Sequence, residues 1–425
     1  MLYYNLFYKW SFQGAEPSAA ILHPAGFDAT RLRGGVPAAD HLGNVMIDPD
    51  LHFWGLEPET CGKVCRNLST HDWMDLDLPR AEDFPGKKDE WQAAIDRMLP
   101  DAWPPVSPTN DDELKALIER CLDWQLVNGA SAVILPTPTI EDDDVGLDEF
   151  VRWAKVGIQA AESIDCVALL SVSILDLALP RHYERLVDLV TSLPDVPGLY
   201  VAVITSRDEG IVPDSREFAR ALLEISHVVG HQHGLPVVIN FADVFGLACV
   251  AVGAEGFGFG YERKCRGLSR AAYQDSGDGG GAYPRFFSLG TAASYLPARD
   301  LDRVRDERLL WMLDQDETQA SLPLLGALRA GSSGNDAPAW REGRNNVAAA
   351  RAHLIQRLEL ANSELLAMTD IRERAQWALR WLQNAERDAN YLRARFVDDP
   401  LQSMGTHVGP WRAAYEQFVV DYRLV

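Results

Sequence analysis

The sequence contains few cysteines and no long apolar run, and these two absences narrow the class of protein. Only six cysteines occur in 425 residues, which argues against a secreted domain stabilised by disulfides. No stretch reaches 18 consecutive apolar residues, and the aromatic start MLYYNLFYKWSF lacks the basic region and cleavage site of a signal peptide. We therefore expect a cytoplasmic protein with reduced cysteines and no membrane contact.

Several cofactor and metal signatures are also absent. The glycines of GAEGFGFG (253–260) run through a late apolar stretch instead of opening a helix after a first strand, which excludes a Rossmann fingerprint. Cys61 and Cys65, in CGKVC, have no second pair. His227 and His231 lack the glutamate of H-E-x-x-H and suit the C-terminus of a helix. No serine elbow or P-loop occurs. We therefore expect no metal and no cofactor.

Positive charge is scarce and unevenly distributed. The formal net charge is −22. Residues 299–425 contain 17 arginines, no lysine and 19 acidic residues, so their net charge is −2 and that of the remainder is −20. Because an acidic surface repels phosphate backbones, nucleic acid could bind only through the C-terminal region. A small molecule is the expected partner of the rest of the chain.

Between residues 18 and 263 the chain alternates short apolar runs with amphipathic stretches. This alternation is typical of a parallel sheet built from βα units. Amphipathic segments at 112–129, 147–163, 181–193 and 214–234 have helical spacing. The expected strands are 19–27, 44–50, 131–137, 166–174, 198–205, 236–242 and 256–261.

The number and character of these strands favour an α/β fold of one kind, a (β/α)8 TIM-type barrel. Near-continuous apolar strands are covered on both faces, in a barrel or in an open doubly wound sheet. Seven visible strands in units of about thirty residues favour the barrel over the open sheet. The eighth strand is expected either in the irregular insertion at 57–110 or in the opening YYNLFY.

The sequence changes in character after residue 263. We expect SGDGGG (276–281) to be a mobile loop near the barrel mouth, 303–315 to be a helix and 331–338 to be a linker. Two strong helices follow, and apolar stripes on them are typical of a core or a partner interface. The predicted domains are a barrel at 1–295, containing the insertion, and an all-helical C-terminal domain at 296–425. A protein partner or a second copy could dock on its helices.

Candidate site residues follow from the rule that barrel chemistry lies at the carboxyl ends of the strands. Carboxylates that meet there can act as general acid and base, or as nucleophile and acid. Asp243 has an alternative role as a cap of the next helix. The catalytic candidates are Asp48, Asp50, Asp243 and Glu262. The first candidate substrate contacts are His23, His52, Arg207 and Glu209.

The glycines of the last strand complete the candidate set. Gly258 and Gly260 remove side chains where a ligand can approach the backbone, and N–H groups there commonly bind an anion. Arg263 follows directly in a local basic cluster and is a further candidate contact. The alternative is that small residues merely fit a crowded barrel interior.

The order of these segments resembles the tRNA-guanine transglycosylase-like (β/α)8 barrels. AAILHPAGFDATRLRGG resembles their first strand and its turn, and VMIDPDLHFW their second. GLYVAVITSRDEG is similar to the strand that ends in their substrate contact. VVINFADVFGLACVAVGAEGFGFGYERKCR resembles their last two strands, which end in an arginine, here Arg263. The resemblance covers roughly residues 18–267 and is topological. The zinc cluster, the DSGGFQ signature and the strand-eight nucleophile are missing, since Gly258, Phe259 and Gly260 stand at that last position.

Two functions follow as hypotheses. The first is a TIM-barrel enzyme that uses strand-end carboxylates on a small anionic or nucleobase-bearing substrate, by the glycosyl transfer or hydrolysis that the resemblance implies. The second is a barrel without catalysis that serves as a scaffold or binding subunit through its helical C-terminal domain.

Overall fold

The structure is a computed structural model that describes most of the chain. The described residues are 1–7, 15, 17–30, 42–105, 107–140, 144–175, 180–205, 212–274, 284–337, 340, 347–398, 401 and 405–425.

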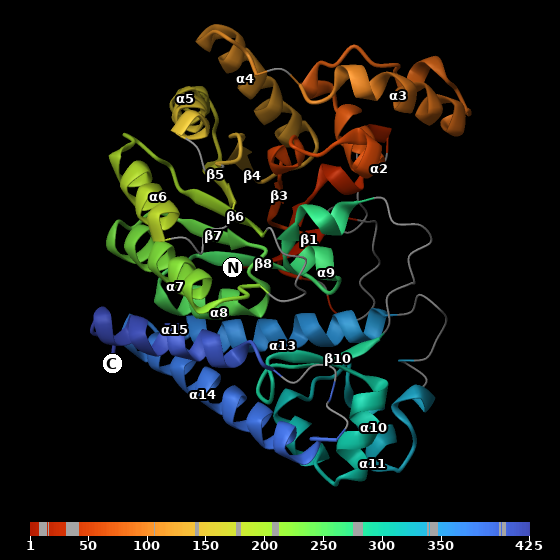
Figure 1. Cartoon of the computed structure of the whole chain (residues 1–425), viewed down its shortest axis with the longest axis vertical. Coiled ribbons are helices and arrows are strands. Elements are labelled where there is room, and N and C mark those ends of the chain that lie inside the picture. Colours follow the sequence, from red (N-terminus) through yellow and green to blue (C-terminus); the bar gives the residue numbers. More distant parts are fainter. Residues whose placement is uncertain are drawn as a thin grey trace.

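Eight parallel strands form a closed barrel, as the sequence predicts (Figure 1). Each strand pairs with the next one along the chain, and β8 pairs with β1 to close the ring. A ninth short strand, β9 (Leu268–Ser269), pairs in parallel with the end of β6. The barrel strands are β1 (Leu2–Leu6), β2 (Ala19–Leu22), β3 (Val45–Ile47), β4 (Ala132–Leu135), β5 (Val167–Leu175), β6 (Leu199–Thr205), β7 (Val237–Asn240) and β8 (Gly256–Phe259).

The strand that the sequence left unplaced is β1, which begins at Leu2 and overlaps the opening YYNLFY. Tyr3 pairs with Ala19 of β2 on one side and with Gly258 of β8 on the other. The expected strands therefore follow as β2 to β8, in the predicted order. The insertion at 57–110 is helical in its described part, with α2 (Pro58–Ser69) and α3 (Lys88–Ala102).

Helices surround the barrel where the amphipathic segments predict them. Side-chain caps fix two of their starts: Asn110 accepts a hydrogen bond from the Glu113 N–H, and Ser215 from the Phe218 N–H. A π-helical segment, Ser226–Gln232, directly continues the helix that ends at Ile225. The helices are α4 (Asp111–Val127), α5 (Asp144–Ala161), α6 (Pro180–Ser192), α7 (Arg216–Ile225) and the short α8 (Gly246–Val252).

The rest of the chain is largely helical, as expected, but it begins with an antiparallel hairpin that crosses residue 295. The helix expected at 303–315 is divided, because α10 ends at Asp306 and a 3₁₀ segment follows at Leu310–Asp316. Asp370 caps α14 by accepting a hydrogen bond of 2.8 Å from the Arg372 N–H. The elements are α9 (Arg263–Arg266), β10 (Arg285–Ser288), β11 (Ser294–Pro297), α10 (Ala298–Asp306), α11 (Leu322–Arg329), α13 (Ala348–Leu366), α14 (Ile371–Arg395) and α15 (Val408–Asp421).

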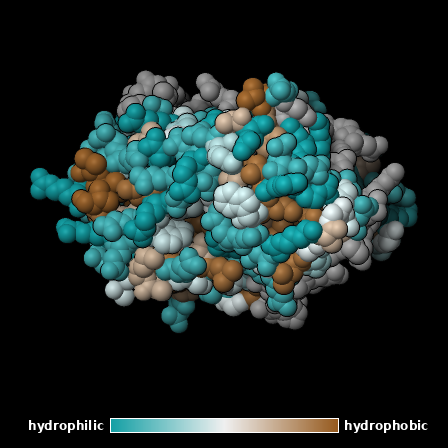
Figure 2. All heavy atoms as spheres, turned by 90° about the horizontal axis from the view of Figure 1, so that it is seen from below, coloured by the Kyte–Doolittle hydropathy of each residue, from teal (hydrophilic) through white to brown (hydrophobic). Residues whose placement is uncertain are grey.

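The C-terminal helices pack against the outer helices of the barrel. Helix α15 contacts α7, α14 contacts α8, and α13 contacts β10, so the blue helices of Figure 1 lie beneath the barrel. Leu354, Leu358 and Trp381, on the two long helices where apolar stripes are expected, are buried. Viewed from below, the surface is mostly hydrophilic with separate hydrophobic patches (Figure 2).

Two further sequence expectations concern the SGDGGG loop and a membrane-spanning helix. The loop SGDGGG lies outside the described residues, and its far side leads to the buried Phe286 and Phe287. Within the described part of the chain, no helix is long and apolar enough to cross a membrane.

Candidate active site at the barrel mouth

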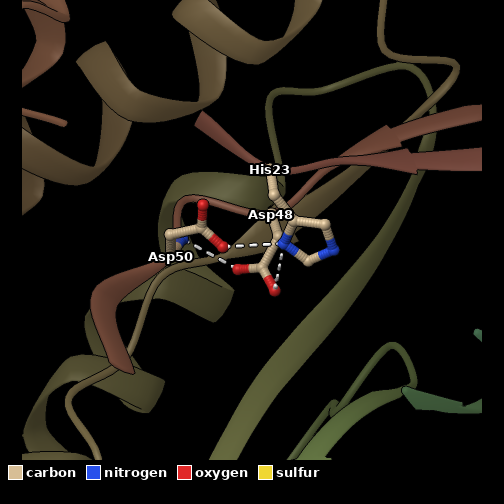
Figure 3. A group of neighbouring side chains, drawn as sticks. All are labelled: His23, Asp48 and Asp50. Atoms are coloured by element: carbon tan, nitrogen blue, oxygen red, sulfur yellow. Dashed lines mark hydrogen bonds and ion pairs between the residues drawn. The ribbon is translucent and has the colours of Figure 1, made fainter. Parts of the chain in front are cut away.

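Three of the predicted residues meet at the carboxyl end of the barrel strands (Figure 3). His23 follows β2, and Asp48 and Asp50 follow β3. The Nδ1 atom of His23 lies 2.8 Å from Oδ1 of Asp50 and 3.9 Å from Oδ2 of Asp48. All three side chains are at most 2% exposed. The sequence therefore identified the centre of a buried polar cluster.

Each carboxylate is held by donors from several parts of the barrel. Asp50 accepts a hydrogen bond of 2.8 Å from the backbone N–H of Ala25 on its Oδ2 atom. Asp48 accepts the Asp50 N–H on Oδ1, at 2.8 Å, and the Tyr200 hydroxyl on Oδ2, at 2.6 Å. Tyr200 stands on β6 and reaches through the barrel interior. These donors fix the orientation of both carboxyl groups.

The backbone beside the cluster adopts an unfavourable conformation at three residues. Asp50, Phe241 and Asp243 have φ angles of 57°, 61° and 46°, in the left-handed region that favours glycine. Such residues cost about 1–3 kcal/mol each and cluster at functional sites. Three of the eight such residues in the described chain therefore lie after β3 and β7, which is consistent with a functional role for this end of the barrel.

Two backbone groups determine the direction of the hydrogen bonds in the cluster. The carbonyl of Cys265 can only accept, so the atom of Asn5 that lies 2.9 Å from it is the amide nitrogen. The N–H of Phe241 can only donate, so the atom of Asn240 at 2.8 Å is the oxygen. The Asn240 amide nitrogen then donates to the Tyr200 hydroxyl, whose own proton goes to Asp48.

These directions require a proton between His23 and Asp50. Because Asn5 turns its nitrogen to Cys265, its Oδ1 atom faces Nε2 of His23 at 3.1 Å, so Nε2 must carry hydrogen and donate. The other ring nitrogen, Nδ1, faces Oδ1 of Asp50. Suppose that His23 were neutral, with its hydrogen on Nε2, and that Asp50 were charged. A lone pair on Nδ1 of His23 would then face a lone pair on Oδ1 of Asp50. One additional proton must therefore lie between these two atoms.

Burial places that proton on Asp50 and leaves Asp48 able to ionise near neutral pH. Burial lowers the pKa of His23 to about 4, against the opposing effect of Asp48, and burial raises the pKa of Asp50 well above its usual value. Burial, and secondly the neighbouring Asp50, raise the pKa of Asp48 to about 6. The surroundings thus favour different protonation states for the two carboxyl groups, with Asp50 the one that keeps its proton more readily.

The other two catalytic candidates lie in separate contacts. Asp243 is buried 3.6 Å from Arg266, and burial raises its pKa to about 6 although Arg266 opposes the shift. Glu262 makes an ion pair of 2.6 Å with Arg351, which comes from α13. In the described structure, neither carboxylate has a hydrogen bond or ion pair with Asp48 or Asp50.

The candidate substrate contacts are divided in the same way. His52 belongs to the cluster, with Nε2 3.5 Å from Oδ1 of Asp50. Arg263 begins α9 and is exposed. Arg207 and Glu209 lie outside the described residues.

The two candidate glycines make room for side chains of the protein. A Cβ atom on Gly258 would lie 1.9 Å from the Asn240 oxygen, and one on Gly260 would lie 2.2 Å from the Cys265 Cβ. Asn240 and Cys265 therefore fill the space beside the two glycines, as expected if small residues are needed in a crowded barrel interior. Anion binding by the backbone there stays a prediction.

Aromatic rings cover the imidazole of His23. The ring of Phe7 stacks on it, with centroids 4.2 Å apart and planes 4° apart. Tyr273 lies 5.5 Å from Phe7, and the Lys264 ammonium lies 5.8 Å and 5.9 Å from the Phe7 and Tyr273 ring centres. Sequence reasoning placed Lys264 only in the basic cluster after the last strand, and it missed Phe7 and Tyr273. It also missed Asn5, Tyr200 and Asn240, whose signal was a single polar residue inside an apolar strand.

A hollow lies between the segment after β2 and the helices α2 and α3, and its walls contain none of the candidate residues. It has a volume of about 610 Å³, including solvent at its opening, and its walls include Thr30, Ser69, Arg80 and Trp91. His71 also lines it and lies with Nε2 3.0 Å from the Phe27 carbonyl. The hollow therefore shares no residue with the His23, Asp48 and Asp50 cluster.

His23, Asp48 and Asp50 are also the residues that could hold a metal. Among the described residues they form one group in which one donor atom from each lies within 4.8 Å of the others.

Fold and site together define a (β/α)8-barrel protein with a buried acid and carboxylate pair at the carboxyl end of its strands. Comparison with known protein families, with curated proteins and with solved structures finds no match for this chain. The function must therefore be argued from the site itself.

Proposed function

We propose that the chain is an enzyme that acts on a small anionic or nucleobase-bearing substrate by glycosyl transfer or hydrolysis, in the manner of the transglycosylase-like barrels. One observation carries this proposal: Asp48 and Asp50 are neighbours, yet their surroundings favour different protonation states. Two carboxyl groups separated in this way are the usual acid and base of an enzyme.

The proposed reaction assigns one role to each carboxyl group. Asp48, as the carboxylate, attacks the sugar carbon or activates the attacking group, while Asp50 gives its proton to the leaving group. An oxygen of each group lies within 4.8 Å of the other. This upper bound lies below the roughly 5–5.5 Å of glycosidases that form a covalent intermediate and further below the roughly 6.5–9.5 Å of inverting ones. We therefore favour two displacements, in which the entering base or water releases Asp48 and returns a proton to Asp50.

The surroundings fit a planar substrate with a negative group. Phe7 and Tyr273 are buried and would offer ring faces only once a substrate displaces the groups that cover them, and Lys264 places a cation beside them. Because the carboxylates are at most 2% exposed, the substrate must displace residues that cover them. A small substrate also suits the acidic body, which disfavours polymers of phosphate. A cytoplasmic location is part of the same proposal.

Base exchange and base release test the proposal directly. The protein is incubated with a panel of nucleosides and nucleotides and with isotopically labelled guanine, and exchange and free base are measured by mass spectrometry. Asp48→Asn and Asp50→Asn should each lower the rate about 10²–10⁴-fold, as is typical of a lost acid or base. The exposed His233→Gln serves as the matched control. No exchange or release by the wild-type protein, or full activity in both Asp variants, contradicts the proposal.

The scaffold function remains a second candidate because of the C-terminal surface. Several large apolar side chains there are solvent-exposed, including Trp311 at 64% and Leu360 at 52%. The Trp381 face is buried and so is not this surface. If Trp311→Ser removes biological activity while Asp48→Asn retains it, the scaffold function replaces the enzyme.

A further inference from the structure

We propose that His23, Asp48 and Asp50 bind one divalent transition-metal cation in the barrel mouth. The ligand atoms are Nδ1 of His23, Oδ2 of Asp48 and Oδ1 of Asp50. Binding of this ion does not rest on the proposed function. While the ion is bound, Asp48 and Asp50 are its ligands, so a water molecule on the ion would have to supply the attacking group and the proton that these two residues supply in the metal-free reaction. The site departs from the sequence expectation of no metal, because that expectation rested on local motifs and these ligands come from two separate strands.

The three ligand atoms are already arranged around one point (Figure 3). Two of their separations are 2.8 Å and 3.9 Å, and all three are within 4.8 Å. A metal with bonds of about 2.0–2.2 Å holds its neighbouring ligands roughly 2.8–3.6 Å apart. Small side-chain rotations are therefore sufficient to bring the three atoms onto one ion.

Charge is the second argument. Asp48 and Asp50 are buried, and within the described residues no lysine or arginine forms an ion pair with either of them. A buried charge without a counter-charge is expensive, so buried carboxylates are normally paired or coordinate metals. In the metal-free site the proton on Asp50 leaves Asp48 as the buried charge, and a divalent cation that displaces this proton would neutralise both carboxylates.

The atoms that face away from this point form the outer contacts that metal ligands normally have. His23 donates Nε2–H to Asn5, Asp50 accepts the Ala25 N–H on Oδ2, and Asp48 accepts a backbone N–H on Oδ1. Ligating histidines and carboxylates are almost always oriented by such bonds. Nδ1 of His23 and Oδ1 of Asp50 then face inward, together with Oδ2 of Asp48, which also accepts the Tyr200 hydroxyl.

The donor types indicate the class of ion. One imidazole nitrogen and two carboxylate oxygens suit Zn²⁺, Mn²⁺, Fe²⁺ or Co²⁺, whereas Mg²⁺ and Ca²⁺ prefer oxygen alone. His52, with Nε2 3.5 Å from Oδ1 of Asp50, is near enough to become a fourth ligand. When the ion binds, the proton between His23 and Asp50 leaves for the solvent. A bound ion of this class would supply a Lewis acid or an activated water molecule.

Cobalt and zinc alone are the probes for the test. The full-length protein is stripped with a chelator and dialysed, and Co²⁺ binding is followed by equilibrium dialysis and by visible absorption, with Zn²⁺ as competitor. We expect one ion per chain, displaced by Zn²⁺. His23→Gln, Asp48→Asn and Asp50→Asn should each abolish this binding. Tyr200→Phe, which removes an outer contact, should weaken it about 10–100-fold.

A control variant locates the ion. His227 and His231 lie with ring centres 5.1 Å apart and are a competing place for adventitious metal, so His231→Gln must retain the site. Circular dichroism establishes that each variant is folded. Absence of stoichiometric binding in the wild type, or unchanged binding in any folded variant of the three ligands, overturns the proposal. Binding without base exchange would reject the proposed function alone, and exchange by chelated protein would reject only the role of the ion.

Discussion

The hydroxyl of Tyr200 donates a hydrogen bond of 2.6 Å to Asp48, which lies 152 positions away in the chain. Tyr200 stands on β6 and Asp48 follows β3, and these strands are not neighbours in the barrel. The same hydroxyl accepts a hydrogen bond from Asn240 of β7. A single phenol therefore connects the polar groups of three strands through the interior.

Removing this hydroxyl should destabilise the protein. Tyr200→Phe leaves the buried amide of Asn240 without its acceptor and Asp48 without one donor, and an unsatisfied buried group costs about 1–3 kcal/mol. We expect the free energy of unfolding in urea to fall by that amount. Tyr391→Phe, at a side chain that is 42% exposed, is the control and should change little. Equal stability of the two variants would show that Tyr200 carries no structural hydrogen bond.

Gly258 should tolerate no side chain. Gly258→Ala would place Cβ 1.9 Å from the Asn240 oxygen, and overpacking of this kind typically costs about 1–3 kcal/mol. The matched control is Gly326→Ala in α11, where an added Cβ meets nothing within 4 Å. That variant should gain about 0.5–1 kcal/mol, because alanine loses less entropy than glycine in a helix. Melting temperatures that move in the same direction for both variants would contradict the packing of the two asparagines against Gly258.

Stability should decrease in mild acid because of buried neutral histidines. Burial, and secondly Arg357, lower the pKa of His353 to about 4, while an unfolded histidine titrates near about 6.5. The unfolded chain therefore binds this proton first, so the stabilisation is complete above pH 6.5 and is lost as pH falls towards 4. The loss approaches roughly 3 kcal/mol for this residue.

The measurement is urea unfolding at several pH values between 7.5 and 4.5. His353→Gln should show a shallower dependence of the unfolding free energy on pH, by up to one proton. His233→Gln, at an exposed position, should keep the wild-type slope. A wild-type slope in His353→Gln would mean that folding does not lower the pKa of His353.

The barrel was predictable because its signals are local. Apolar runs such as VVIN and VAVIT specify strands, and amphipathic stretches with caps specify helices, so β2 to β8 and α4 to α7 follow from the sequence. Strand β1 was harder to place, because its tyrosines and Asn5 interrupt the apolar pattern. The division of the 303–315 helix was missed because the helical spacing continues through a segment that tertiary contacts wind as a 3₁₀ turn.

The site was predictable only in part. Asp48, Asp50 and His23 follow strands, and the rule about carboxyl ends is sufficient to select them. The partners that give them different protonation states were not accessible, because Tyr200, Asn240 and Asn5 lie inside strands and point across the barrel. The ion pair between Glu262 and Arg351 depends on how α13 packs against the barrel, and no local sequence pattern predicts that contact.

Replacing Asp48 should raise stability and remove activity together. The folded pKa of about 6 lies above the value of about 3.9 in an unfolded chain, so the folded state holds the proton more tightly. That stabilisation is present below pH 4 and is lost as pH rises through 6, so the charged form costs roughly 3 kcal/mol at pH 7. Asp48→Asn removes this cost and loses one of two hydrogen bonds, because the amide N–H₂ cannot accept a hydrogen bond from Tyr200 or from the Asp50 N–H, a loss of about 1–2 kcal/mol.

In chelator-treated protein we therefore expect Asp48→Asn to unfold at higher urea concentration than the wild type at pH 7.5, and at similar or lower concentration at pH 4.5. Asp123→Asn, at an exposed position, should show no such reversal. A residue that destabilises the fold at neutral pH is retained for another reason, and loss of base exchange in the same variant would supply that reason. If Asp48→Asn is less stable than the wild type at pH 7.5, Asp48 is part of the structural framework and the carboxylate at the centre of the proposed reaction must be sought elsewhere.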